Sequence, residues 1–111
     1  MAGKFELKKS SDGQYVFHLK ASNGQVILAS ERYKERRGAV RGIDSVRRNS
    51  AVDGRYERKT AKNGQTYFIL RASNGKTIGQ SEMYASAAAL EKGIESVKKN
   101  AADAKVDDTN A

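Results

Sequence analysis

An internal duplication constrains this chain more than any other feature of its sequence. When the sequence is shifted against itself by 51 residues, residues 4–51 align with residues 55–102 without a gap, and 20 of the 48 aligned pairs are identical. Two copies are fewer than the roughly three stacked units that an open solenoid needs to bury a continuous core. We therefore predict a closed, pseudo-symmetric pair in which both copies share one interior.

Length and composition limit the organisation of the chain and its chemistry. A chain of 111 residues favours one domain, which we divide into repeat 1 (residues 3–52) and repeat 2 (residues 54–108). The absence of cysteine excludes disulfides and thiolate metal sites, and the single histidine excludes multi-histidine zinc sites. No apolar leader and no long apolar run occurs, so we expect a soluble, cytoplasmic protein with no membrane contact.

Each copy opens with sequence patterns that are typical of β-strands. In repeat 1, apolar residues alternate with polar ones over residues 4–8 and 16–20, which indicates two half-buried strands. A third apolar run covers residues 26–29. The turn sequences Asp12-Gly13 and Ser22-Asn23-Gly24 separate these runs, so they predict two successive hairpins.

The second turn decides which side chains share a face of the sheet. A two-residue Asn-Gly loop would pair Lys20 with Ile27 and place that isoleucine opposite the apolar face. A three-residue loop with Gly24 in a G1 bulge instead pairs Leu19 with Ile27. We favour the bulge because it collects the large apolar residues of both repeats on one side. These residues are Phe5, Leu7, Phe17, Leu19, Ile27, Tyr56, Phe68, Leu70 and Ile78.

A helical period follows the strands in both copies. Apolar and small residues recur at helical spacing, at Ala39, Ile43, Val46 and Ser50 in repeat 1 and at Leu90, Ile94, Val97 and Ala101 in repeat 2. Ser86 is a suitable N-cap for the second helix. We expect another backbone to approach closely at Gly42 and Gly93, because glycine lowers helix stability by about 1 kcal/mol relative to alanine.

These patterns predict an α+β fold built from two tandem β-β-β-α repeats. The simplest arrangement is one antiparallel sheet with both helices packed on one face, because this buries two apolar helix stripes and one apolar sheet face together. The tail after residue 102 is mostly polar, and its Lys105-Val106-Asp107 segment is compatible with either a short edge strand or a coil.

The repeated motifs give the chain a resemblance to a known family. The Asn-Gly turns, the Ser-Glu-x-Tyr segments at residues 30–33 and 81–84, and the Gly-Ile-x-Ser-Val helix ends resemble the YegP-like family of small bacterial proteins. The resemblance covers residues 3–108. It implies β-β-β-α repeats joined in one sheet, with C-terminal strands that can be exchanged between the halves, and it implies no activity, cofactor or catalytic residue.

The first predicted helix carries an excess of positive charge. Residues 32–48 have a net charge of +5, whereas the matching residues 83–99 have +1. At 100° per residue, Arg37, Arg41 and Arg48 fall within about 40° of one another and opposite the apolar stripe. We expect these arginines, together with Arg36, to face water. They form either a solubilising surface or a site for phosphates, whose binding would depend on salt.

The second candidate is the sheet face opposite the predicted core. Its central residues would be Val16, His18, Val26 and Leu28 from repeat 1 and Tyr67, Ile69 and Thr77 from repeat 2. The basic residues expected at its border are Lys4, Lys8, Lys20, Arg55, Lys59 and Arg71. A patch of this kind favours contact with a second copy or another protein, although cations around apolar groups also occur in single-strand RNA binders.

No catalytic constellation accompanies these surfaces. His18 is replaced by Ile69 in repeat 2, and no serine or carboxylate is placed beside it by a known motif. Ser30-Glu31 and Ser81-Glu82 recur, and we interpret the serines as residues that end the third strand. We therefore expect a non-enzymatic binding or assembly module without cofactor or metal. Protein contact through the open sheet face is the first hypothesis, and weak nucleic-acid binding through Arg36, Arg37, Arg41 and Arg48 is the alternative.

Overall fold

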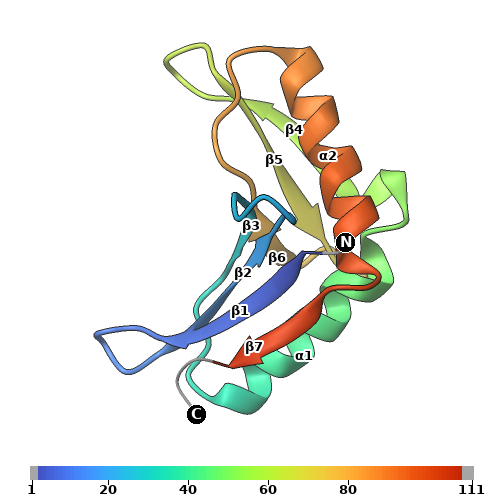
Figure 1. Ribbon diagram of the computed structural model, residues 1–111. Helices are drawn as coiled ribbons and strands as arrows, with labels where there is room; N and C mark the ends of the chain where they lie inside the picture. The colour runs from blue at the N-terminus through green and yellow to red at the C-terminus, as the bar shows by residue number, and fades with distance from the viewer. Residues whose placement is uncertain (1–2, 109–111) are drawn as a thin grey trace.

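A computed structural model describes residues 3–108 and shows three strands and a helix in each repeat, followed by one further strand (Figure 1). The elements of repeat 1 are β1 (Lys4–Lys9), β2 (Tyr15–Lys20), β3 (Val26–Ser30) and α1 (Arg36–Asn49). A short 3-10 helix, η1 (Asp53–Arg55), leads to β4 (Tyr56–Thr60), β5 (Thr66–Arg71), β6 (Thr77–Gln80), α2 (Ala87–Ala101) and β7 (Lys105–Asp108). The alternation and helical period seen in the sequence therefore predict the elements correctly.

All seven strands form one sheet in the order β4-β5-β6-β3-β2-β1-β7. The pairs among β1 to β6 are antiparallel, as predicted, and the two repeats meet where β3 pairs with β6. The expectation of a purely antiparallel sheet is wrong at one edge, because β7 pairs with β1 in parallel. The tail thus forms an edge strand, and the C-terminal strand of repeat 2 completes the half of the sheet that repeat 1 builds. The part of the predicted tail after residue 108 lies outside the described residues.

Both helices lie on one face of the sheet, as predicted, and each contacts strands of both repeats (Figure 1). Helix α1 packs on β2 of its own repeat and on β5 and β6 of the other, while α2 packs on β5 and on β1, β2 and β3. Side chains from both halves form one buried cluster, and the nine residues predicted to share a face all belong to it. Within residues 3–108, neither helix is long and apolar enough to span a bilayer.

The turn between β2 and β3 has the predicted three-residue loop, but the strand after it contains a second irregularity. Gly24 has a positive φ of 86°, and the backbone N–H of Ala21 donates to the carbonyl of Gln25. The expected pair Leu19–Ile27 does not form, because a further bulge shifts the register and pairs Leu19 with Leu28. Leu28 is therefore fully buried in the core, and its predicted place on the open face is wrong.

The same bulge occurs in repeat 2, where Leu70 pairs with Gly79, but the residues at the shifted position differ. Gly79 occupies the position in β6 that Leu28 occupies in β3. A Cβ built on Gly79 would lie 2.9 Å from Cγ of Leu28, so the leucine fills space at the junction that two large side chains could not share. One repeat thus supplies the side chain and the other supplies the room for it.

The helix glycines make room for tyrosine rings rather than for another backbone, which corrects our expectation. A Cβ on Gly42 would clash with the hydroxyl of Tyr33, and one on Gly93 would clash with that of Tyr84. Each tyrosine stacks on the phenylalanine of the middle strand in its own repeat, at ring-centroid distances of 6.2 and 6.3 Å. The Ser-Glu-x-Tyr segments therefore anchor the chain between the last strand of each repeat and its helix.

Replacing Leu28 by alanine tests the shifted register. Because Leu28 is fully buried, Leu28→Ala should lower the free energy of unfolding by about 2–5 kcal/mol, as measured by urea denaturation. Val26→Ala, at a half-buried position two residues earlier, should cost less. If Leu28→Ala were as mild as Val26→Ala, the register described here would be contradicted.

Candidate interaction surface on the open sheet face

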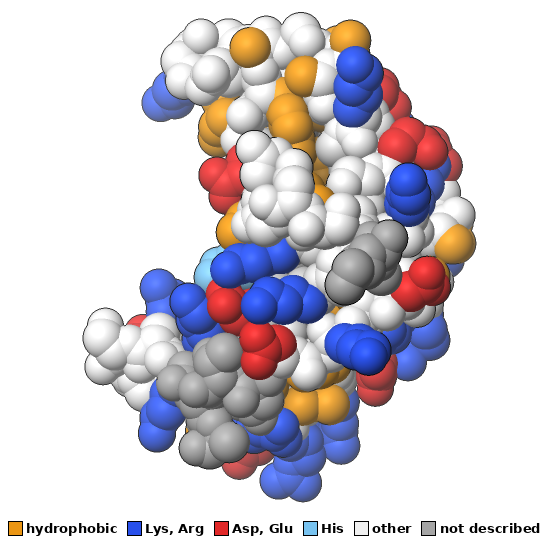
Figure 2. Space-filling model, viewed as in Figure 1, with side chains coloured by type: hydrophobic (Ala, Val, Ile, Leu, Met, Phe, Trp, Pro, Cys, Tyr) orange, Lys and Arg blue, Asp and Glu red, His pale blue; other side chains and the backbone are white. Residues whose placement is uncertain are grey.

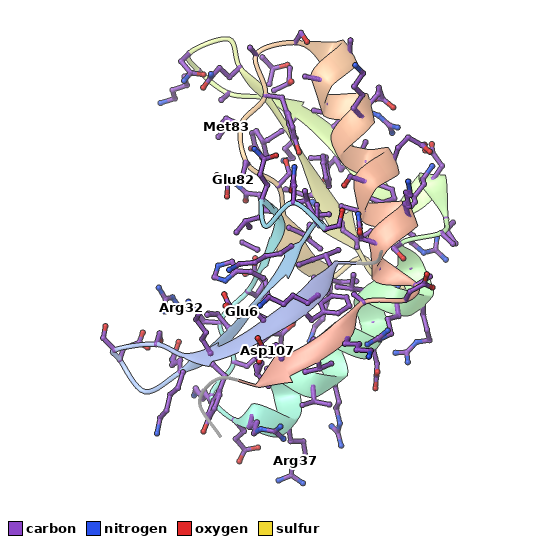
Figure 3. The ribbon with its side chains drawn as sticks, viewed as in Figure 1. Glu6, Arg32, Arg37, Glu82, Met83 and Asp107 are labelled. Carbon is purple, nitrogen blue, oxygen red and sulfur yellow. The ribbon has the colours of Figure 1, made fainter. Side chains whose placement is uncertain are left out.

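The face of the sheet that the helices leave uncovered, here called the open face, is concave. Figure 1 shows both helices on the opposite side, and Figure 2 shows the molecule hollowed on the open side between the projecting β1–β2 and β4–β5 hairpins. In Figure 3, Met83 and Glu82 lie along the upper part of this hollow, and Glu6 and Arg32 lie along its lower part. Both repeats therefore contribute side chains to one continuous surface.

Each half of the open face carries a carboxylate held between two cations. In repeat 1, Glu6 on β1 lies 3.0 Å from Nζ of Lys20 and 3.4 Å from Nζ of Lys8. The hydrogen bond from Lys20 is the main cause that lowers the pKa of Glu6. The side chain of Glu6 is only 11% exposed, so both cations lie over it and leave the triad with a net positive charge.

Repeat 2 builds the same triad at the matching positions. Glu57 on β4 accepts bonds from Nε and Nη2 of Arg71, the first at 2.8 Å, and Lys59 lies 3.8 Å from its other oxygen. The bonds from Arg71 lower the pKa of this carboxyl. Since the triad recurs in both repeats, its first role is to tie the first strand of each repeat to the second.

The centre of the open face is less apolar than the sequence predicts. Val16, His18, Tyr67 and Ile69 occupy it as predicted, and each side chain is half-buried. Leu28 is missing from this surface because the bulge turns it into the core. The open face is therefore a mixed surface, with apolar groups between charged triads.

Two further residues on this face escaped the sequence analysis. The bridge between Thr66 and Tyr84 brings the adjacent residues Tyr67 and Met83 opposite one another, and Met83 is 45% exposed. Arg32 takes the matching place in repeat 1. Both residues follow the predicted third strand of their repeat. The apolar–polar pattern of the sequence did not indicate that the chain continues beside the sheet there. Their alternation with the core tyrosines was the signal that could have placed them.

One predicted border residue does not belong to the open face. Arg55 lies in η1, and its Nε donates to the side-chain oxygen of Asn49 at 3.1 Å. The amide of Asn49 also donates to the carbonyl of Ser45 at 2.8 Å. Asn100 repeats this arrangement, since it accepts from the backbone N–H of Gly3 at 2.9 Å. The asparagines at the helix ends thus fasten each helix to the segment that leads into the first strand of a repeat.

His18 lies on the open face directly across from Glu6 in the β1–β2 ladder. Burial is the main cause that lowers the pKa of His18 below its ordinary value of 6.5. The negative charge of the opposing Glu6 raises the pKa of His18, but this effect is smaller than that of burial.

The recurring serines have a structural role in both repeats. Oγ of Ser30 accepts from the backbone N–H of Phe17 at 2.9 Å and donates to the carbonyl of Glu31 at 2.7 Å. Ser81 makes the same two bonds, with Phe68 and Glu82. Each hydroxyl replaces a ladder bond where the third strand turns away, which agrees with our interpretation of these residues.

The second candidate surface lies on α1, away from the open face. Arg36, Arg37, Arg41 and Arg48 are all exposed, as predicted, and Arg37 lies 3.7 Å from Glu35. Arg47 differs from them, because its guanidinium packs 5.1 Å from the ring centroid of Phe5 and donates to the carbonyl of Ala104 at 2.7 Å. Arg47 therefore holds the connection between α2 and β7 and is not available to a ligand.

Known proteins resemble this chain over nearly its whole length. Two segments, residues 10–57 and 61–108, match the family described as Domain of unknown function (DUF1508). The chain is 55% identical to the UPF0339 protein YegP of Escherichia coli strain K12, over 97% of this chain and 98% of the relative. It is 51% identical to the UPF0339 protein PA0329 of Pseudomonas aeruginosa, with the same coverage.

Solved structures show the same fold. The solution NMR structure of yegP from E. coli, a protein of unknown function, matches with a TM-score of 0.93 at 54% identity, covering 98% of this chain and 94% of that one. The NMR structure of UPF0339 protein SO3888 from Shewanella oneidensis matches with a TM-score of 0.91 at 48% identity, covering 97% and 92%. Their descriptions assign no activity, ligand or partner.

The burial of His18 predicts a pH dependence of stability. Because the folded state lowers the imidazole pKa, the unfolded state takes up a proton more readily, and stability should fall as the pH drops below 6.5. His18 is the only histidine, so His18→Gln should remove the loss of stability between pH 7 and 5. Urea denaturation at several pH values measures this. An NMR titration midpoint of 6.5 or above would contradict the effect of burial.

Proposed function

The chain belongs to the DUF1508 family, and from that premise we propose that it is a non-enzymatic binding or assembly module that contacts a protein partner through the open face. The concave face opposite the helices is the observation that carries this proposal (Figure 2). A two-layer fold covers only one face of its sheet, and the uncovered face is free to receive a further layer. The half-buried Tyr67 and Ile69 at its centre supply apolar area for such a contact.

Charge supports a partner with an acidic surface. Among the described strand residues whose side chains lie on the open face, six are cationic and three are carboxylates. The cations are Lys4, Lys8, Lys20, Lys59, Arg71 and Lys105, and the carboxylates are Glu6, Glu57 and Asp107. The triads at the two outer parts of the sheet retain positive charge, which would attract and orient carboxylates of the partner.

The bonding of the polar side chains supports the non-enzymatic part of the proposal. The hydroxyls of Ser30 and Ser81 are occupied by backbone groups, and His18 has an isoleucine in its place in repeat 2. The carboxylates of Glu6 and Glu57 are held by cations that lower their pKa values. General acid catalysis at neutral pH requires a raised carboxyl pKa, which is the opposite shift.

Ile69→Lys tests the proposed contact. A lysine at the half-buried centre of the open face should weaken partner binding at least tenfold, because it places an additional charge inside the contact. Sedimentation velocity measures self-association, and quantitative affinity capture from cell extract, with nuclease treatment at two salt concentrations, measures other partners. Ala88→Lys, on an exposed position of α2, is the matched control. The proposal is wrong if the wild-type protein is monomeric and the Ile69→Lys variant captures the same proteins as the wild type.

A second candidate function is weak, non-specific nucleic-acid binding through α1. The four exposed arginines favour it, since repeat 2 places only Ala87, Ala88, Lys92 and Lys99 at the matching positions. Phosphates that pair with such a surface release counterions, so the affinity would fall steeply with salt.

Arg37→Glu combined with Arg41→Glu tests this second function. If both arginines contact phosphates, the double variant should weaken binding and reduce the slope of log affinity against log salt by about 2. A mobility-shift titration of single-stranded and double-stranded oligonucleotides from low to physiological salt measures both quantities. Lys92→Glu combined with Lys99→Glu, on exposed positions of α2, serves as the control. Equal binding by the wild-type protein and the arginine variant would rule out this surface.

A further inference from the structure

The sheet has a gap at the junction of its two halves. Strands β3 and β6 share only two residue pairs, Ala29 with Gln80 and Ser30 with Gly79. Beyond them, the segment after β6 turns toward β5, and a hollow of about 430 Å³ remains beside the start of β3. It is lined by Gln25, Val26, Ile27, Glu82, Met83 and Tyr84. We call it the junction hollow.

A second hollow lies on the other side of the junction and also borders α1. It measures about 330 Å³, and its lining includes Gly42 and Ser45 of α1 as well as Glu31, Tyr33, Thr77 and Ile78. Thr77 stands in the place of Val26, and Arg32 corresponds to Met83. Since the fold accepts polar residues at these positions, folding alone does not require the apolar pair Val26 and Met83 in the junction hollow.

A band of side chains crosses the open face through the junction hollow. In repeat 2, Lys59 pairs with Tyr67, and Tyr67 comes opposite Met83. In repeat 1, Val26 pairs with Lys20, which pairs in turn with Lys4. Met83 and Val26 line the same hollow, so they connect the two halves of the band. The band is apolar in the middle and cationic at both ends.

The length of the band can be compared with a helix. Lys59 on β4 and Lys20 on β2 are separated by four strand spacings, or about 19 Å at roughly 4.8 Å per spacing. A helix rises 1.5 Å per residue, so about 13 residues cover this distance. The sheet face offers no free backbone groups to an extended chain, whereas a helix satisfies its own hydrogen bonds and has a convex surface that suits a concave one.

We infer that the open face binds an amphipathic α-helix of a protein partner, which lays its apolar side over the rim of the junction hollow and places carboxylates near Lys20 and Lys59. This inference rests on the proposed function and specifies the partner. Apolar residues three and four positions apart would contact Tyr67, Val26 and Met83, and acidic residues at both helix ends would meet the cations.

A synthetic helix of about 16 residues provides the probe. It carries leucines three and four positions apart and glutamates at both ends, and a second peptide replaces each glutamate with lysine. We expect the acidic peptide to shift the amide NMR signals of Val26, Met83 and Lys20 and the lysine peptide to leave them unchanged. Met83→Arg, which copies the residue of repeat 1, should raise the dissociation constant of the acidic peptide at least tenfold. Ala88→Arg, at an exposed position of α2 on the other side of the sheet, is the matched control and should leave it within about twofold.

Two outcomes would overturn the inference. One is the absence of any signal change on the open face with the acidic peptide. The other is binding that Met83→Arg leaves unchanged, or that maps to the arginines of α1. If Ile69→Lys abolished capture of a partner while either outcome held, the open face would remain a protein contact surface and only the helical partner would be wrong.

Discussion

The shared core is the constraint on which the rest of the structure depends. Each repeat supplies a three-stranded sheet segment and one helix, and each helix packs across the junction onto strands of the other repeat. The apolar stripe of α1 is therefore buried in part by β5 and β6, and that of α2 in part by β1 to β3. Because both helices occupy the same side, the opposite face of all seven strands is left uncovered. The candidate surface is thus a direct result of how the core is assembled.

The sequence predicted the elements and most of the core, because period and turn chemistry are local properties. The alternation around Phe17 and the left-handed Gly24 are examples, since a few neighbouring residues determine both. The register after the second turn could not be predicted in the same way. Leu19 pairs with Leu28 and Leu70 pairs with Gly79, so both repeats contain the same additional bulge although one has leucine and the other glycine there, and no residue pattern common to both marks the bulge. The parallel pairing of β7 was also beyond prediction, since it depends on where α2 ends.

Comparison of the two repeats separates residues that hold the fold from residues that are free to differ. The core positions Phe17, Leu19, Tyr33 and Gly42 have identical counterparts, and so do the serine at the strand end and the asparagine at the helix end. On the open face the charge triad recurs, because it joins neighbouring strands. In contrast, the centre of that face differs at each matching pair: Val16 and Tyr67, His18 and Ile69, Val26 and Thr77, Ala29 and Gln80, Arg32 and Met83.

This divergence gives the open face a direction that two identical halves could not provide. A symmetric pair would present the same hollow twice, and a bound helix would have two equivalent orientations. Here one hollow is lined by Val26 and Met83, while the other has Thr77, with Arg32 at the position matching Met83. Among residues 3–108, the strands beyond Lys20 add Lys4 and Lys105 on the repeat 1 side, whereas Lys59 on the edge strand β4 ends the band on the repeat 2 side. Acidic residues are favoured at a helix N-terminus, where the helix carries a partial positive charge. The more acidic end of a partner helix would therefore prefer the repeat 1 side, which has more lysines. The duplication therefore kept most core positions the same in both repeats, and the differences on the opposite surface would let it distinguish the two orientations of the proposed helix.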